Sequence, residues 1–181
     1  MKLKRNPGFT LVELMIAMTI MGLLILLALP SFSRWIANTK VRTMAESLQN
    51  GLRLTQLEAA KRNSTVTLSL TNDDSPDCTS TAVSSGKNWI ICAETNAIQT
   101  GIGKAGSENV IVNSGFSSIS FDGLGRTNLA AAATVALSSS AGSCETSSTE
   151  GIRCLSVLIS PAGKVRLCDP RLSSPDPAAC S

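Results

Sequence analysis

The sequence predicts an α+β protein in which a long N-terminal helix packs on a mainly antiparallel β-sheet head. Two observations support this fold class. An apolar run near the N-terminus leads into an amphipathic stretch with helical spacing. From residue 63 onward, short β-favouring runs alternate with Gly, Ser, Asn and Asp. The 181 residues suffice for one globular head with a hydrophobic core.

Residues 9–30 are predicted to form a membrane-spanning helix. Phe9–Leu29 carries Glu13 as its only charge, and about 1.5 Å of rise per residue gives roughly 30 Å, which matches the hydrocarbon core of a bilayer. A secretory signal is disfavoured, because bulky Phe32 and Trp35 follow the apolar run where small residues are expected. A plain anchor leaves Glu13 unexplained, since an unpaired charge in lipid costs about a few kcal/mol. A buried core helix is the third alternative.

Residues 31–62 are predicted to form an amphipathic helix of the head. Pro30 is expected to kink the chain at the start of this segment, because it removes a backbone donor. Gly51 marks a candidate bend. The predicted apolar stripe, which should pack on the sheet, consists of Ala37, Val41, Met44, Leu48, Leu52, Thr55 and Ala59.

Residues 63–181 are predicted to form a β-rich head that ends in a disulfide-stapled region. Residues 71–87 and 138–151 are expected to be loops. The predicted strands are 65–70, 88–93, 109–112, 118–121, 133–137, 155–160 and 164–167.

Six cysteines, all downstream of the apolar run, predict three disulfides in an oxidising compartment. Fifteen pairings are open to six cysteines. We favour sequential pairing, because it staples each predicted loop locally. Metal binding is disfavoured, since the chain has no histidine and no C-x-x-C. The favoured pairs are Cys78–Cys92, Cys144–Cys154 and Cys168–Cys180.

The composition argues against an enzyme and against bulk attraction to a polyanion. The absence of histidine removes the commonest general base, and no nucleophile with a recognisable base is evident. We therefore expect no catalytic residue and no cofactor. Lys2, Lys4 and Arg5 supply the whole excess of sixteen basic over thirteen acidic residues, so the charges balance without residues 1–8.

Two further patterns have plain structural interpretations. Residues 101–106 spell G-x-G-x-x-G, but a strand-like run follows where a dinucleotide loop needs a helix, so we predict a flexible turn. Asp73, Asp74 and Asp77 lack the spacing of a calcium loop and are interpreted as a solvated acidic turn.

Basic residues near the C-terminus form a candidate phosphate-binding patch. Lys164 and Arg166 alternate onto one face of a predicted strand, with Arg171 nearby. The alternative is an edge strand that its charges keep soluble, and the residue chemistry alone favours this alternative.

The segment Lys4-Arg5-Asn6-Pro7-Gly8-Phe9-Thr10-Leu11-Val12-Glu13-Leu14 resembles the processing site of type IV prepilins and type II secretion pseudopilins. The resemblance implies that residues 1–8 are a leader that a prepilin peptidase removes after Gly8. It also implies methylation of the new N-terminal Phe9. In the family, Glu13 pairs with a neighbouring subunit's N-terminal amine, and a proline often stands at the position of Pro30, so both are expected to be assembly residues.

The head resembles the GspH/FimT branch of minor pilins and pseudopilins, on the strand arrangement, residues 121–126 (FDGLGR) and residues 163–166 (GKVR). Some members bind DNA through a C-terminal G-R-x-R motif. Lys164 replaces the first arginine of that motif and lacks the bidentate fork of a guanidinium.

The resemblance implies a minor pilin that helps to initiate or assemble a type IV pilus. The expected partners are other major and minor pilins, the prepilin peptidase and an inner-membrane assembly platform. The expected location is the bacterial inner membrane, single-pass with a periplasmic head, and then the pilus or pseudopilus. Two alternatives remain: a DNA-binding minor pilin for uptake, and a minor pseudopilin of a type II secretion system.

Overall fold

The computed structural model describes residues 9–103, 106–146 and 149–180, except for the side chains of residues 27–30. The chain divides into two compact units, residues 1–35 and residues 36–181, and we call the second unit the head. The helix α1 contributes to both units. The elements are α1 (Leu11–Arg62), β1 (Val66–Thr71), β2 (Asn88–Ala93), β3 (Asn96–Ile102), β4 (Val110–Ser114), β5 (Ser118–Phe121), β6 (Ala133–Ser139), β7 (Leu155–Ile159) and β8 (Val165–Cys168).

The first part of α1 is apolar and exposed throughout its described side chains. Within the described residues no single helix has the length and apolar character needed to cross a membrane, although the stretches Leu11–Leu26 and Ser31–Arg62 meet both conditions when taken together. The predicted kink at Pro30 falls in residues 27–30, whose side chains lie outside the described part, and it stays a prediction.

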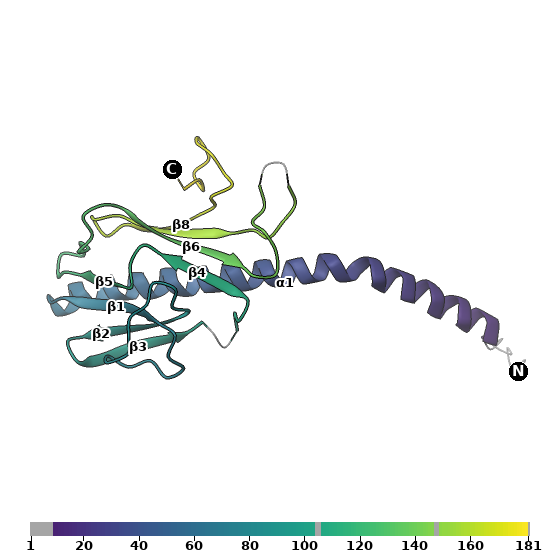
Figure 1. Ribbon diagram of the computed structural model, residues 1–181, viewed down its shortest axis with the longest axis horizontal. Helices are drawn as coiled ribbons and strands as arrows, with labels where there is room; N and C mark the ends of the chain where they lie inside the picture. Colours follow the sequence, from purple (N-terminus) through teal and green to yellow (C-terminus); the bar gives the residue numbers. More distant parts are fainter. Residues whose placement is uncertain (1–8, 104–105, 147–148, 181) are drawn as a thin grey trace, which may run out of the picture. The chain divides into compact units, whose positions relative to one another are not determined.

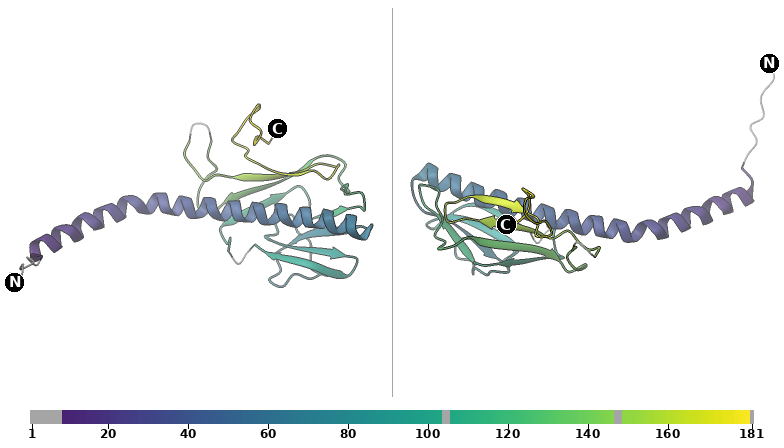
Figure 2. Two further views of the ribbon diagram at one scale, coloured as in Figure 1. Left: turned by 180° about the vertical axis from the view of Figure 1, so that it is seen from behind. Right: turned by 90° about the horizontal axis from the view of Figure 1, so that it is seen from above.

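The part of α1 in the head supplies one wall of the hydrophobic core. Every residue of the predicted apolar stripe is buried, and Ala45 joins it, which confirms the amphipathic helix. Figure 2 shows this part of the helix lying across the strands of both sheets. The helix ends at Arg62, where Asn63 takes the left-handed conformation with φ 48°.

The strands of the head form two four-stranded antiparallel sheets, with strand orders β3-β2-β1-β5 and β4-β6-β7-β8 (Figure 1). Apolar side chains alternate along their strands; for example Val66, Leu68 and Leu70 of β1 are buried. The antiparallel, helix-backed fold class is confirmed. The strands are divided between two sheets, which the sequence patterns do not specify.

Strand β3 corrects one prediction, because Gly101 and Ile102 belong to a strand and not to a flexible turn. Gly101 lies opposite Trp89 in the register of β2 and β3. A Cβ on Gly101 would collide with the indole of Trp89, and one on Gly51 of α1 would lie 3.1 Å from it. The two glycines therefore leave room for the Trp89 ring. In the sequence alone, a glycine in a strand is easily mistaken for a glycine of a turn. Lys104 and Ala105 lie outside the described residues.

Three disulfides cross-link the head, and they are the sequential pairs favoured from the sequence. They join Cys78 to Cys92, Cys144 to Cys154, and Cys168 to Cys180. The first ties the loop between β1 and β2 to β2 itself. The other two staple the loop before β7 and the segment after β8.

Candidate functional site

The start of α1 carries the residues expected to act in assembly. Gly8 lies outside the described residues, while the Phe9 side chain is exposed. Glu13 is the acidic residue of the first helical turn, where the positive end of the helix dipole stabilises a carboxylate. The apolar side chains around it, such as Leu11 and Leu14, are exposed as well. A helix of this character requires partners, either lipid or other apolar helices.

Thr10 caps the helix that presents Glu13, a role that our sequence analysis missed. The Thr10 Oγ1 accepts a hydrogen bond of 3.2 Å from the Glu13 N–H. The spelling Thr10-Leu11-Val12-Glu13 matches the S/T-x-x-E signature of a capping box, so the signal was present in the sequence. The cap holds the Glu13 backbone at the first turn and thereby limits where its carboxylate can lie.

A second candidate region forms where two distant turns of the head meet. The Gln56 side chain of α1 donates a hydrogen bond of 2.9 Å to the Gly125 carbonyl. The Thr127 N–H donates one of the same length to the Pro161 carbonyl. Residues 121–126 and 163–166, which carry the head resemblance, therefore lie at one place in the fold, which we call the paired turns (residues 122–127 and 160–164).

Lys164 stands at the tip of the paired turns and is exposed. Its N–H donates to the Ser160 Oγ, which helps to set the turn before β8. Arg126, also exposed, belongs to the neighbouring turn and forms an ion pair of 2.9 Å with Asp122. Sequence analysis gave Arg126 no role. Arg166 follows within β8, opposite Leu158, and is half-buried.

Asp122 organises its turn as an acceptor for three donors. The backbone N–H groups of Leu124 and Arg126 donate to its Oδ1, and the Arg126 Nε donates to its Oδ2. These bonds, with the Arg126 N–H first, hold the pKa of the Asp122 carboxyl below its usual value. The Asp122 carboxylate therefore stays charged near neutral pH. It pairs with the Arg126 guanidinium, which a phosphate would also attract.

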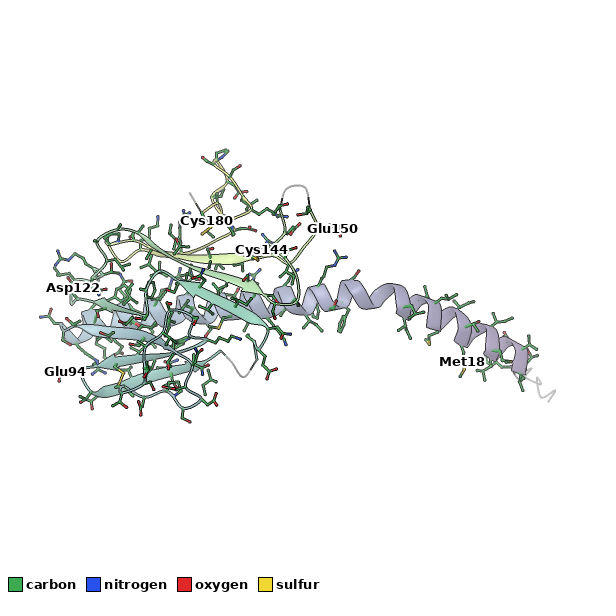
Figure 3. The ribbon with its side chains drawn as sticks, in the orientation of Figure 1. Met18, Glu94, Asp122, Cys144, Glu150 and Cys180 are labelled. Atoms are coloured by element: carbon green, nitrogen blue, oxygen red, sulfur yellow. A yellow bond between two sulfur atoms is a disulfide. The ribbon has the colours of Figure 1, made fainter. Side chains whose placement is uncertain are left out.

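Arg171 lies away from Lys164, because the two residues flank opposite ends of β8. Figure 3 shows Asp122, which belongs to the turn beside Gly163, at one end of the head and Cys144, which precedes Glu145, toward the other. The Arg171 Nη1 donates to the Glu145 Oε1 at 2.8 Å. The structure thus brings Lys164 and Arg126 to one region and Arg171 to another.

Arg171 lines a pocket of about 450 Å³ between the two stapled segments. In this pocket the buried Asp169 accepts hydrogen bonds from the Arg153 Nε and from the Arg171 N–H, both at 2.9 Å. The Arg153 N–H donates in turn to the Asn38 side chain of α1. The charges in the pocket are therefore largely paired with one another, which favours a role in holding the C-terminal segment. The remaining lining residues are Cys144, Thr146, Cys154 and Pro170.

Among the described residues, no group of three or more Asp, Glu, Cys or His side chains is placed to hold a metal ion. In the acidic turn, Asp77 accepts hydrogen bonds from the side chains of Thr79 and Ser80. Hydrogen bonding, with the Thr79 hydroxyl first, lowers the pKa of the Asp77 carboxyl. The Asp77 side chain therefore stabilises the loop in which it lies.

The geometry of the head, with one helix backing two antiparallel sheets, is that of a type IV pilin-like fold. Two crystal structures of the type IV minor pilin FimU from Pseudomonas aeruginosa share it. One superimposes with a TM-score of 0.51 at 18% identity, covering 77% of this chain and 99% of FimU. The other gives 0.54 at 17%, covering 81% and 99%.

Two protein families that match the sequence narrow the class beyond a type IV pilin-like fold. Residues 3–29 match the prokaryotic N-terminal methylation motif, and residues 44–163, more than half of the chain, match the family described as type II transport protein GspH. The chain belongs to the GspH family of minor pilins and pseudopilins. No curated protein matches the sequence. Members of this class are structural subunits that are anchored in a membrane and assemble with other pilins.

Proposed function

We propose that this chain is a minor pilin, a structural subunit that helps to initiate or assemble a type IV pilus. In this proposal a prepilin peptidase cuts after Gly8 and methylates Phe9. Residues 9–30, with Pro30 at their end, then hold the protein in the bacterial inner membrane as a single span. The head faces the periplasm until an inner-membrane assembly platform moves the subunit into the filament.

One observation carries the proposal: a long apolar helix, capped by Thr10, is exposed and presents a single carboxylate, Glu13, at its first turn. A charge in this position is costly in an apolar surrounding unless an opposite charge pairs with it. The amine of a processed Phe9 on a neighbouring subunit would supply that charge. Filament assembly then buries the apolar surface of the helix and pairs the Glu13 carboxylate with an opposite charge.

The test is the incorporation of a Glu13→Ala variant into filaments sheared from cells. We expect incorporation to fall about tenfold or more, since loss of one partner of a desolvated pair costs several kcal/mol and about 1.4 kcal/mol corresponds to tenfold. Glu46→Ala is the matched control, because Glu46 is a carboxylate of the same helix that pairs with Arg42 on the head surface. Equal incorporation of Glu13→Ala and wild type would overturn the role of Glu13.

A minor pseudopilin of a type II secretion system is the alternative within the same family. The two placements differ in their partners and not in their fold. Crosslinking in native membranes followed by mass spectrometry distinguishes them: pilus subunits among the crosslinked partners support the proposal, and secretion pseudopilins support the alternative.

A second candidate function is DNA binding for uptake, which the exposed position of Lys164 beside Arg126 favours. In this proposal Lys164 and Arg166 contact backbone phosphates without reading the sequence. Arg171, our third candidate, already pairs with Glu145 and must exchange partners to take part.

Titration of DNA with the full chain in detergent, at several salt concentrations, tests this candidate. Binding that weakens with salt and is lost in Lys164→Ala/Arg166→Ala would support it. Lys40→Ala/Arg42→Ala removes the same charge from α1 and should leave binding unchanged. Failure to bind at low salt would exclude a DNA-receptor role.

A further inference from the structure

Three of the six aromatic residues of the chain flank its apolar run. Phe9 begins the run, Phe32 and Trp35 follow it, and residues 10–31 contain no aromatic residue. Residues 14–33 also contain no charged residue, and Arg34 is the first basic residue after the run. Tryptophan, with its amphipathic ring, is typical of the membrane–water interface, and Trp35 stands just beyond the C-terminal end of the run.

Phe32 and Trp35 form one exposed aromatic pair. They are three residues apart on α1, which places them on one face of the helix. Their ring centroids are 5.8 Å apart with an angle of 27° between the planes. The exposed fractions are 57% for Phe32 and 62% for Trp35, although both are large apolar side chains.

The distance along the helix places this pair at the level of lipid headgroups. If Leu29 marks the end of the hydrocarbon core, a rise of about 1.5 Å per residue puts Phe32 roughly 4.5 Å and Trp35 roughly 9 Å beyond it. The headgroup layer is about 5–7 Å thick on each side. Helical side chains point toward the N-terminus, so each ring lies nearer the core than its own Cα.

We infer that Phe32 and Trp35 are a lipid-binding anchor that fixes the depth of the subunit at the outer interface of the membrane. The anchor rests on the proposed membrane insertion and adds to it a definite position for α1. The amphipathic indole stays among the headgroups and resists movement of the helix in either direction. The partner is the glycerol and headgroup region of a phospholipid bilayer.

The fluorescence of Trp35 tests the inference directly, because Trp89, the other tryptophan, is 4% exposed within the head core. The full chain, after removal of the leader, is reconstituted at a low protein-to-lipid ratio in phosphatidylcholine vesicles that carry bromine near the glycerol backbone or near the chain ends. We expect stronger quenching by the shallow bromine than by the deep bromine. Trp35→Phe should reduce quenching to the background of Trp89.

Vesicle flotation separates this inference from the proposed function. Failure of the chain to float with the vesicles would reject membrane insertion itself. Flotation without quenching of Trp35, or with stronger quenching by the deep bromine, would overturn the anchor and leave insertion standing.

Discussion

At the scale of single residues, glycines decide how closely segments of the head approach one another. Gly163 has φ +84°, which side chains rarely adopt, and a Cβ there would collide with the Gly125 carbonyl. Gly125 itself has φ +77° and lies beside Gln56. The paired turns therefore meet through backbone, and the basic residues on them are held in place by that contact.

Gly163→Ala should destabilise the head by about 2 kcal/mol or more, because it adds left-handed strain of about 1–2 kcal/mol to a steric collision. Urea unfolding followed by Trp89 fluorescence measures the loss in a Trp35→Phe background. Gly115→Ala is the control, since its added Cβ would have only the Thr134 carbonyl as a neighbour, at 4.0 Å. Equal stabilities for the two variants would show that the turns do not depend on Gly163.

At the scale of elements, α1 joins two segments with different surroundings. Its exposed apolar part begins at the Thr10 cap, and its amphipathic part ends in basic residues that suit the negative end of the helix dipole. Lys61 and Arg62 both form ion pairs with Glu58. These pairs, with the hydrogen bond from Arg62 first, lower the pKa of the Glu58 carboxyl.

Thr10→Ala should increase fraying of the first turn, since an N-cap is worth about 1 kcal/mol. Amide hydrogen exchange of the processed chain in micelles should show the Glu13 N–H exchanging roughly fivefold faster, the factor that corresponds to this energy. Thr10→Ser keeps the hydroxyl and should restore slow exchange. An unchanged rate in Thr10→Ala would mean that the cap does not hold the first turn.

At the scale of the whole molecule, the head combines a shared core with local cross-links. The buried face of α1 and the inner faces of both sheets form one hydrophobic cluster. The disulfides instead join residues separated by 14, 10 and 12 positions, outside or at the edge of that core. The core sets the fold, and the disulfides restrict the long connections.

Replacing both cysteines of any one disulfide by serine should lower stability by about 3 kcal/mol, as expected for closed loops of similar length. If loop-closure entropy determines the loss of stability, the three losses should agree within about 0.5 kcal/mol. Denaturant unfolding monitored by Trp89 fluorescence gives the values. A Cys168→Ser/Cys180→Ser variant with unchanged stability would show that the C-terminal segment is held by the Arg153–Asp169 contact instead.

Local sequence patterns were sufficient to predict much of the fold and one part of the candidate site. The stripe from Ala37 to Ala59 has helical spacing, and burial of one helix face follows from that spacing alone. Seven of the eight strands carry enough β-favouring residues to be recognised. The motif that contains Glu13 was equally recognisable, because N-terminal basic charge, glycine, phenylalanine and apolar length all lie within thirty residues.

The remaining features depend on contacts between distant residues, which local patterns do not encode. Strand β3 was missed because Gly101 is required by the Trp89 ring from another strand. The division into two sheets depends on which strands pair, a long-range choice made by the shared core. The ion pair that Arg171 forms with Glu145 joins residues 26 positions apart, and no local pattern indicates it. The sequence therefore determines most of the elements and the N-terminal methylation motif, while tertiary packing decides which charges of the head lie together.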